Sequence, residues 1–277
     1  MSLYFVLSID GDWAEYFSSR LPVAERYPDK NTLCRLIRHE IYVTSGIKGK
    51  FLHFVHTSPT SRDFFTQPEL IALWKEIQAN GGSVGVHCHH ESLFDQDHAV
   101  HQTKKRDAIT SLTKKLTEHG LNPISYRGGY LSFSAEDIPF LEENGLCIDF
   151  SCDPGRHLVQ NGTLFSDWQG APTNYYRMAY EDHRTPGTSK VIEIPLGKTD
   201  TDSLYIDNVS LWSIWKCARD LAKRSKKETK PIIVSALTHT YEFSSFWKRL
   251  KIKLALAICK RYGAFISDRE ALKLAHA

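Results

Sequence analysis

The sequence has few of the features that mark specialised classes of protein. Its six cysteines form no Cys-x-x-Cys pair, which argues against a disulfide framework or a zinc finger and for reduced thiols. No apolar run reaches the roughly 18 residues that a membrane-spanning helix needs. The formal net charge of the 277 residues is only +3, which is too small to indicate a nucleic-acid partner.

The chain also lacks a recognisable targeting segment. No basic stretch with an apolar stretch and a cleavage site precedes the first apolar run, and a signal peptide would have to include Asp10. Together with the reduced thiols, this predicts a cytoplasmic protein. Hydrophobic residues make up 42% and charged residues 24%, as in an ordinary globular protein, and no linker separates one part from another. We therefore expect a single domain over residues 1–277.

Short apolar runs alternate with longer amphipathic segments along the chain. The apolar runs predict strands at residues 4–9, 51–56, 83–87, 124–126, 147–150, 190–194, 232–236 and 264–267. The segments between them predict helices near residues 32–45, 68–80, 99–119, 135–144, 209–227 and 245–261, with a short one from 268. This alternation predicts an α/β fold, an irregular barrel of about seven or eight parallel strands with outer helices. Residues 153–188 break the rhythm and predict a long ordered loop excursion.

In a parallel sheet the carboxyl ends of all strands share one edge, and loops there build the active site. Residues that bind metals or carry protons lie at the ends of five predicted strands: Asp10 and Asp12, His87 to Glu91, Arg127, Asp149, and His239. The two aspartates alone would fit loop solvation, but carboxylates at a buried strand end need a partner, and a metal ion is one. One edge of the sheet thus collects the groups that a metal-dependent hydrolase needs.

The strongest of these signals is the run of three imidazoles and a carboxylate at His87, His89, His90 and Glu91. Such ligands suit a borderline metal such as zinc, although a solvated loop rich in histidine is the alternative. If the strand continues, His87 and His89 point to the same side. If a helical turn begins there, His87 shares a face with His90 or Glu91. The sequence leaves this choice open.

Five motifs in this order resemble those of the polysaccharide deacetylase family, the NodB-homology domain of carbohydrate esterase family four. They are Ser8-Ile9-Asp10-Gly11-Asp12, Gly85-Val86-His87-Cys88-His89-His90, Tyr126-Arg127-Gly128-Gly129-Tyr130, Asp149-Phe150-Ser151 and Leu237-Thr238-His239. The resemblance spans most of the chain. It departs from the family where Gly11 separates the two acidic residues, where Cys88 replaces a serine or threonine, and where Glu91 stands in place of the second motif's last histidine.

The resemblance implies a role for each motif. Asp10 would be the general base, and Arg127 would orient it. The metal would be held by Asp12, His87 and a second imidazole, either His89 or His90, with Glu91 as another candidate ligand. The backbone at Gly129 and Tyr130 would help bind an oxyanion, and Leu237 would line the acetyl pocket. His239 would be the general acid, and Asp149 would raise its pKa.

The implied activity is hydrolysis of an N-acetyl group on an amino sugar of a polysaccharide or its precursor, of the O-antigen or capsule type. The expected cofactor is a divalent metal, with zinc as the first choice, and the expected partner is the acetylated sugar. Another metal-dependent barrel hydrolase, such as a phosphoesterase or amidohydrolase, and a non-catalytic carbohydrate-binding relative are the alternatives.

Two further features have both a structural and a functional interpretation. Trp168, Tyr175 and Tyr176 could stack on sugar rings, although packing within the loop explains them as well. Residues 247–254 form a basic amphipathic segment that suits either an outer barrel helix or peripheral contact with an anionic membrane. The oligomeric state is not predicted.

Overall fold

The computed structural model describes residues 2–18, 26–58, 62–89, 97–160 and 163–276. Its main sheet runs in the order β10-β1-β2-β3-β4-β5-β9-β8, with β11 paired to β1. The strands are β1 (Leu3–Asp10), β2 (Phe51–His56), β3 (Ser83–Cys88), β4 (Ser125–Gly128), β5 (Ile148–Asp149), β8 (Tyr176–Arg177), β9 (Ile192–Glu193), β10 (Ile232–His239) and β11 (Ala264–Phe265). Every pairing is parallel except β8 with β9. The predicted α/β class is therefore confirmed.

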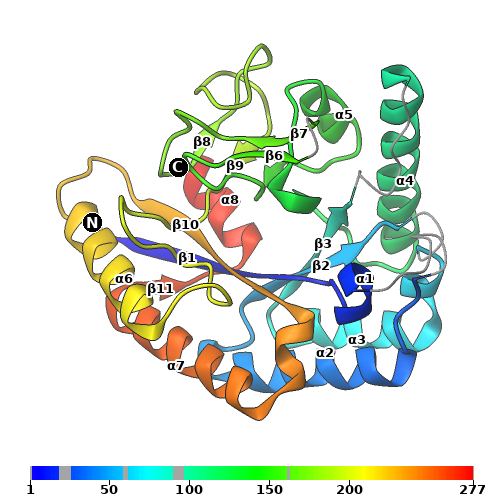
Figure 1. Cartoon of the computed structure of the whole chain (residues 1–277), viewed down its shortest axis with the longest axis horizontal. Helices are drawn as coiled ribbons and strands as arrows, with labels where there is room; N and C mark the ends of the chain where they lie inside the picture. The colour runs from blue at the N-terminus through cyan, green and yellow to red at the C-terminus, as the bar shows by residue number, and fades with distance from the viewer. Residues whose placement is uncertain (1, 19–25, 59–61, 90–96, 161–162, 277) are drawn as a thin grey trace.

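The helices are α1 (Ala14–Ser18), α2 (Lys30–Thr44), α3 (Pro68–Ala79), α4 (His98–Glu118), α5 (Asp137–Glu143), α6 (Leu211–Ser225), α7 (Phe246–Tyr262) and α8 (Asp268–His276). Helices α2, α3, α4, α6 and α7 pack on the outside of this curled sheet, whereas α8 packs on its inner side (Figure 1). Several begin at side-chain caps: Asp29 accepts a hydrogen bond from the backbone of Thr32 in α2, and Ser210 accepts one in α6. Within the described parts of the chain, none of the helices combines the length and the apolar character that crossing a membrane requires.

The two ends of the strand path are joined by irregular backbone. After β9, Gly197 donates a hydrogen bond to the carbonyl of Ser235 in β10, and Ser235 donates one to Pro195. Further along, the Leu237 amide donates a hydrogen bond to the carbonyl of Leu204. Residues 195–206 therefore stand where a regular closing strand would stand, and the barrel is irregular at this point.

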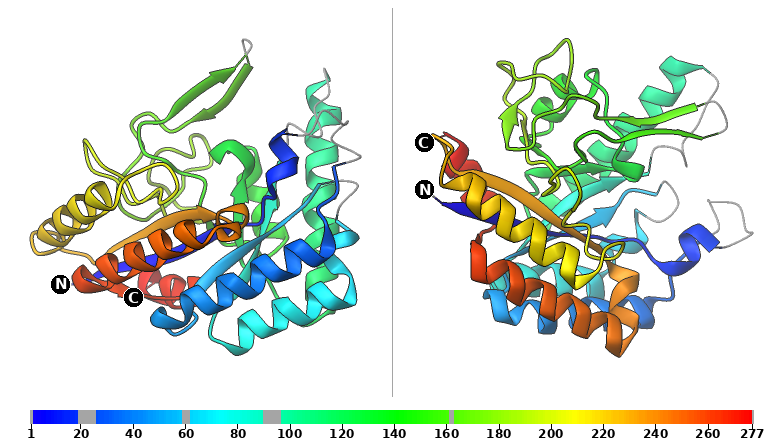
Figure 2. Two further views of the ribbon diagram at one scale, coloured as in Figure 1. Left: turned by 60° about the horizontal axis from the view of Figure 1, so that its bottom comes forward. Right: turned by 60° about the vertical axis from the view of Figure 1, so that its left-hand side comes forward.

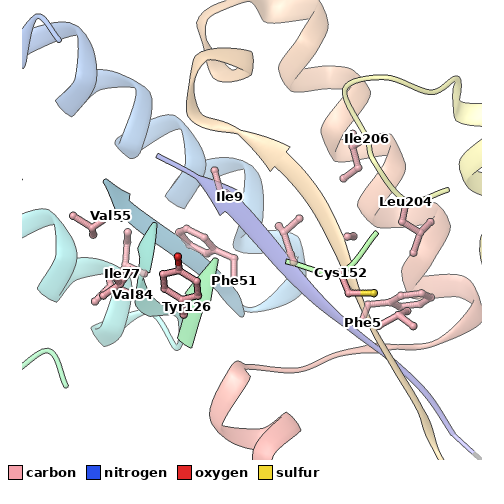
Figure 3. Close-up of a cluster of buried hydrophobic side chains, with 14 of the residues drawn as sticks. Phe5, Ile9, Phe51, Val55, Ile77, Val84, Tyr126, Cys152, Leu204 and Ile206 are labelled. Carbon is pink, nitrogen blue, oxygen red and sulfur yellow. The ribbon is translucent and has the colours of Figure 1, made fainter. Parts of the chain in front are cut away.

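Side chains of alternate parity face the two sides of the sheet. In β1, Phe5, Leu7 and Ile9 pack in a cluster that includes residues of α2, α3, α4, α6 and α7, part of which is drawn in Figure 3. Val6 instead packs in a second cluster made of strand residues and α8. The second cluster is the barrel interior, so Ser8 and Asp10, which share the parity of Val6, point inward.

Residues 153–188 contain more regular structure than the sequence predicts. An antiparallel pair, β6 (His157–Gln160) and β7 (Thr163–Asp167), projects from the sheet, as Figure 2 shows, and β8 follows. Strand β7 is anchored to the barrel because Ser166 Oγ and Trp168 Nε1 both donate hydrogen bonds to the carbonyl of Leu131.

Candidate active site

Two carboxylates lie at the carboxyl end of β1, separated by Gly11. Asp10 and Asp12 are both buried. A Cβ on Gly11 would lie 2.4 Å from the carbonyl oxygen of Phe54, and the Gly11 amide donates to that same oxygen. No larger residue fits against β2 here, which explains why glycine separates the two acids.

Three imidazoles surround Asp12. From Asp12 Oδ1, the Nε2 atoms of His89, His87 and His56 lie at 3.2, 3.6 and 3.7 Å. His87 and His89 are the pair that strand parity favours, whereas His90 and Glu91 lie outside the described residues. His56 was not predicted, although it shares the inward parity of Leu52 and Phe54 in β2 and pairs in register with His87.

Hydrogen bonds at Nδ1 assign opposite tautomers to two of these rings. The backbone N–H of Ser58 donates to His56 Nδ1 at 2.8 Å, so a neutral His56 carries its proton on Nε2. His87 Nδ1 lies 3.0 Å from the carbonyl of Arg127, which only accepts, so this ring carries its proton on Nδ1 and its Nε2 lone pair faces Asp12. His87 is therefore set up as a metal ligand, whereas His56 directs an N–H and not a lone pair toward Asp12.

The donor set fits a divalent metal ion. Asp12 Oδ1 and His87 Nε2 are buried and have no hydrogen-bond partner among the described residues. Two groups of three residues offer ligand atoms within 4.8 Å of one another: Asp12 with His56 and His89, and Asp10 with Asp12 and His239. Distance alone selects His56 as the third ligand, but a neutral His56 carries a proton on the Nε2 that would have to bind the metal. His87 directs a lone pair at the site, so Asp12, His87 and His89 form the better ligand set.

Asp12 is charged in this environment. Burial opposes ionisation, but the adjacent imidazoles of His89 and His87 outweigh it and hold the pKa of Asp12 well below its ordinary value. Burial and the neighbouring His89 lower the pKa of His56, which keeps that ring neutral.

Arg127 fixes the orientation of Asp10. Its Nη1 donates to Asp10 Oδ1 at 2.7 Å, its Nη2 to Ser8 Oγ at 2.9 Å, and its Nε to the carbonyl of Phe150 at 3.0 Å. The guanidinium carbon also lies 4.8 Å from the ring centre of Phe54. This buried, fully bonded ion pair leaves Asp10 Oδ2 directed toward His239 at 3.9 Å.

His239, the last residue of β10, pairs with Asp207 and not with Asp149. Its Nδ1 lies 2.6 Å from Asp207 Oδ2. Burial alone would lower the pKa of His239, but the hydrogen bond with Asp207 and the charges of Asp10, Asp207 and Asp12 raise it. The prediction that Asp149 tunes this histidine is therefore wrong.

Asp149 lies on the opposite side of its strand. Its neighbours Ile148 and Phe150 face the barrel interior, so Asp149 points away from it. It accepts hydrogen bonds from the amide and the hydroxyl of Ser151, and Ser151 Oγ accepts one from the amide of Gly128. Burial raises the pKa of Asp149 and that of its neighbour Glu193, so this carboxyl pair retains a proton. Asp149 thus supports the loop after β4.

That loop packs tightly against the imidazole cluster. A Cβ on Gly129 would lie 2.6 Å from the His89 ring, and one on Gly128 would overlap the carbonyl oxygen of Ser132. Tyr130 takes a left-handed conformation with φ of 54°, which turns the chain into the pocket. The two glycines are required by this close packing, and Gly129 and Tyr130 lie beside His89.

The site opens into a pocket of about 290 Å³. It is lined by Asp10, Asp12, His87, His89, Tyr130, Leu131, Arg156, Tyr205, Asn208, Leu237, His239 and Tyr241. Leu237 packs with Leu131 in a small apolar cluster at its wall. Trp168 and Tyr176 are buried in the core, so packing, the alternative to sugar stacking, accounts for them. Among the described residues, Tyr130, Tyr205 and Tyr241 line the pocket.

No model of a known protein family matches the sequence, and no curated protein matches it. Solved structures match in fold. A protein described as a polysaccharide deacetylase from Mycobacterium smegmatis aligns with a TM-score of 0.61 and 12% identity over 99% of this chain and 90% of its own. One described as a glycoside hydrolase or deacetylase from Parabacteroides distasonis gives 0.64 and 12% over 99% and 71%. The allantoinase PuuE gives 0.57 and 12% over 99% and 90%. These likenesses support the family resemblance at the level of the fold.

Proposed function

We propose that the protein is a metal-dependent hydrolase that removes the N-acetyl group of an amino sugar. The observation that carries the proposal is the meeting, in one pocket, of a ligand set, an oriented carboxylate and a carboxylate-bound histidine. The five ordered motifs and the deacetylases among the structures of similar fold support the same activity.

Asp12, His87 and His89 would hold the metal. A bound divalent ion supplies Lewis acidity and lowers the pKa of water to about 7. The Nε2–H of His56 faces Asp12 Oδ1 at 3.7 Å, and the carbonyl of Arg127 keeps the His87 lone pair directed at the site. We keep zinc as the proposed ion because two imidazoles and one carboxylate are a common zinc set.

Asp10 and His239 divide the proton transfers. Asp10 Oδ1 is bound by Arg127, so Oδ2 is the oxygen that takes the proton of the attacking water. His239 holds its Nδ1 proton on Asp207, and its Nε2, between Asp10 and Asp12, delivers a proton to the leaving amine. Leu131 and Leu237 offer an apolar wall to the acetyl methyl group, and the backbone at Gly129 and Tyr130 faces the developing oxyanion.

The proposal also covers the source of the substrate and the cellular compartment. We place the substrate among precursors of surface polysaccharides of the O-antigen or capsule type. All six cysteines lie in the described part of the chain and none forms a disulfide, which supports a reducing compartment such as the cytoplasm.

Acetate release from N-acetylglucosamine oligomers tests the function. Asp12→Ala should lose both the metal and the activity. Asp10→Asn should keep the metal, measured by elemental analysis, and lose activity by about 10²- to 10⁴-fold, the usual contribution of a general base. Full activity in wild-type protein freed of metal by a chelator would overturn the proposal.

A further inference from the structure

Four residues that line the pocket carry hydrogen-bond donors that have no part in the proposed reaction. They are Arg156, Tyr205, Asn208 and Tyr241. Arg156 is the only arginine or lysine among the described residues that line the pocket. The proposed deacetylation does not use it, because neutral acetyl and amine groups need no guanidinium.

Arg156 is only loosely paired with the nearest carboxylate. Its Nη1 lies 3.8 Å from Asp153 Oδ2, which is beyond hydrogen-bond distance. Asp153 Oδ1 is already bound by Lys198 Nζ at 2.7 Å. Two cations therefore share this one carboxylate.

The guanidinium also has an unused donor. Arg156 Nε is buried and has no hydrogen-bond partner among the described residues. A buried N–H without an acceptor is costly, so the guanidinium is held here with its own hydrogen bonds incomplete. The arginine fork is suited to bidentate binding of phosphate or carboxylate.

Two phenols place this donor group beside the proposed acid. The Tyr241 ring stacks on His239 with 5.0 Å between centroids, and the Tyr205 ring lies 5.7 Å from it. Burial and nearby carboxylates raise the pKa values of both phenols, so both remain O–H donors. The leaving amine, and the sugar ring that bears it, would therefore lie between His239 and the donors.

Resting on the proposed function, we infer that the substrate of this pocket is an N-acetyl sugar that carries an anionic group, a phosphate or a carboxylate, bound by Arg156. A neutral sugar would leave the Arg156 guanidinium with only its loose contact to Asp153.

Three substrates test the inference: N-acetylglucosamine, its 1-phosphate, and the analogue with a carboxylate at C6. Wild-type protein should favour one anionic substrate over the neutral one by about 10- to 100-fold in kcat/KM, the effect of one or two charge-assisted hydrogen bonds. Arg156→Gln should raise KM for that substrate by a similar factor with kcat little changed, and should leave the neutral sugar unaffected. Arg156→Lys should recover part of the loss.

Arg177→Gln is the matched control, because Arg177 is exposed and lies outside the pocket-lining set. Asp153→Asn should not weaken binding of the anionic substrate, because it removes the carboxylate that competes with the substrate for Arg156. Circular dichroism establishes that each variant is folded. An equal effect of Arg156→Gln on all three sugars, or no preference for either anion in the wild type, would overturn the inference.

Calorimetry separates this inference from the proposed function. It measures how metal-free protein binds glucosamine 1-phosphate and glucosamine with a carboxylate at C6. If binding depends on Arg156 but no substrate is hydrolysed, the anion site stands and the proposed deacetylation is wrong. If substrates are hydrolysed but binding does not depend on Arg156, the deacetylation stands and the anion site is wrong.

Discussion

His56 and His87 face the same oxygen of Asp12 but make different hydrogen bonds at Nδ1. The partner of His56 is a backbone N–H and the partner of His87 is a carbonyl, so only His87 directs a lone pair at the site. This difference depends on a single backbone group beside each ring. No reading of residue types could have found it, since both are histidines at the ends of buried strands.

The first prediction compares these two histidines. His87→Ala should leave no metal bound after dialysis, because it removes a ligand. His56→Gln, which keeps a donor in place, should retain the metal with about 10- to 100-fold weaker affinity, the usual cost of losing a group that supports a ligand. Competition with a chromogenic chelator measures both affinities. Equal loss in the two variants would make His56 a ligand as well.

Asp207 provides the second prediction at this scale. His239 has a raised pKa, so the protonated acid persists to higher pH and activity falls as the pH rises through that pKa. Asp207→Asn removes the neighbouring charge, so the alkaline limb of the kcat profile should move to lower pH. Asp149→Asn should leave that limb in place. A shift in the Asp149 variant would show that the site couples the two residues after all.

At the scale of elements, the alternation of side chains decides which candidate residues meet. The sequence predicts the strands and helices well because their apolar periods are strong and their ends carry caps and glycines. It also predicts Asp10, Asp12, His87, Arg127 and His239, which lie at strand ends. Asp149 was misjudged because its parity, visible in Ile148 and Phe150, was outweighed by the motif.

Two residues of the site escaped prediction for different reasons. His56 is the last residue of an apolar run, so the sequence offers no signal that separates it from the rest of a buried strand. Asp207 lies in the irregular segment that joins the sheet ends, where no period shows which way a side chain points. Position in the barrel, and not local pattern, brings both to the site.

The Asp149–Glu193 pair joins β5 to β9 and carries a prediction about stability. Burial, and for Glu193 the charge of Asp149, raises the pKa of Glu193, so the folded protein keeps a proton that the unfolded chain loses near pH 4.3. Its contribution to stability is complete below that pH and declines above it. Glu193→Gln should therefore stabilise the protein increasingly as the pH rises above about 4.3. Urea unfolding at three pH values checks this, and a pH-independent effect would contradict it.

At the scale of the whole molecule, the excursion and the barrel share contacts. Leu131, at the pocket wall, accepts hydrogen bonds from Ser166 and Trp168 of the excursion. Lys198, in the segment after β9, binds Asp153 at the start of that excursion. These contacts favour our prediction of a single domain over residues 1–277.

Thermal unfolding tests that organisation. The far-ultraviolet signal of the barrel and the fluorescence of buried Trp168 and Trp74 should change together in one transition. The calorimetric and van't Hoff enthalpies should agree. Two separated transitions would divide the chain into units.

Asp10 and His239 occupy directly paired positions on the adjacent strands β1 and β10. Their spacing is therefore held by the hydrogen-bond ladder of the sheet. The proposed proton donor and proton acceptor cannot drift apart until the sheet itself opens. Heat inactivation should consequently follow global melting, so residual activity after heating becomes a direct count of folded molecules.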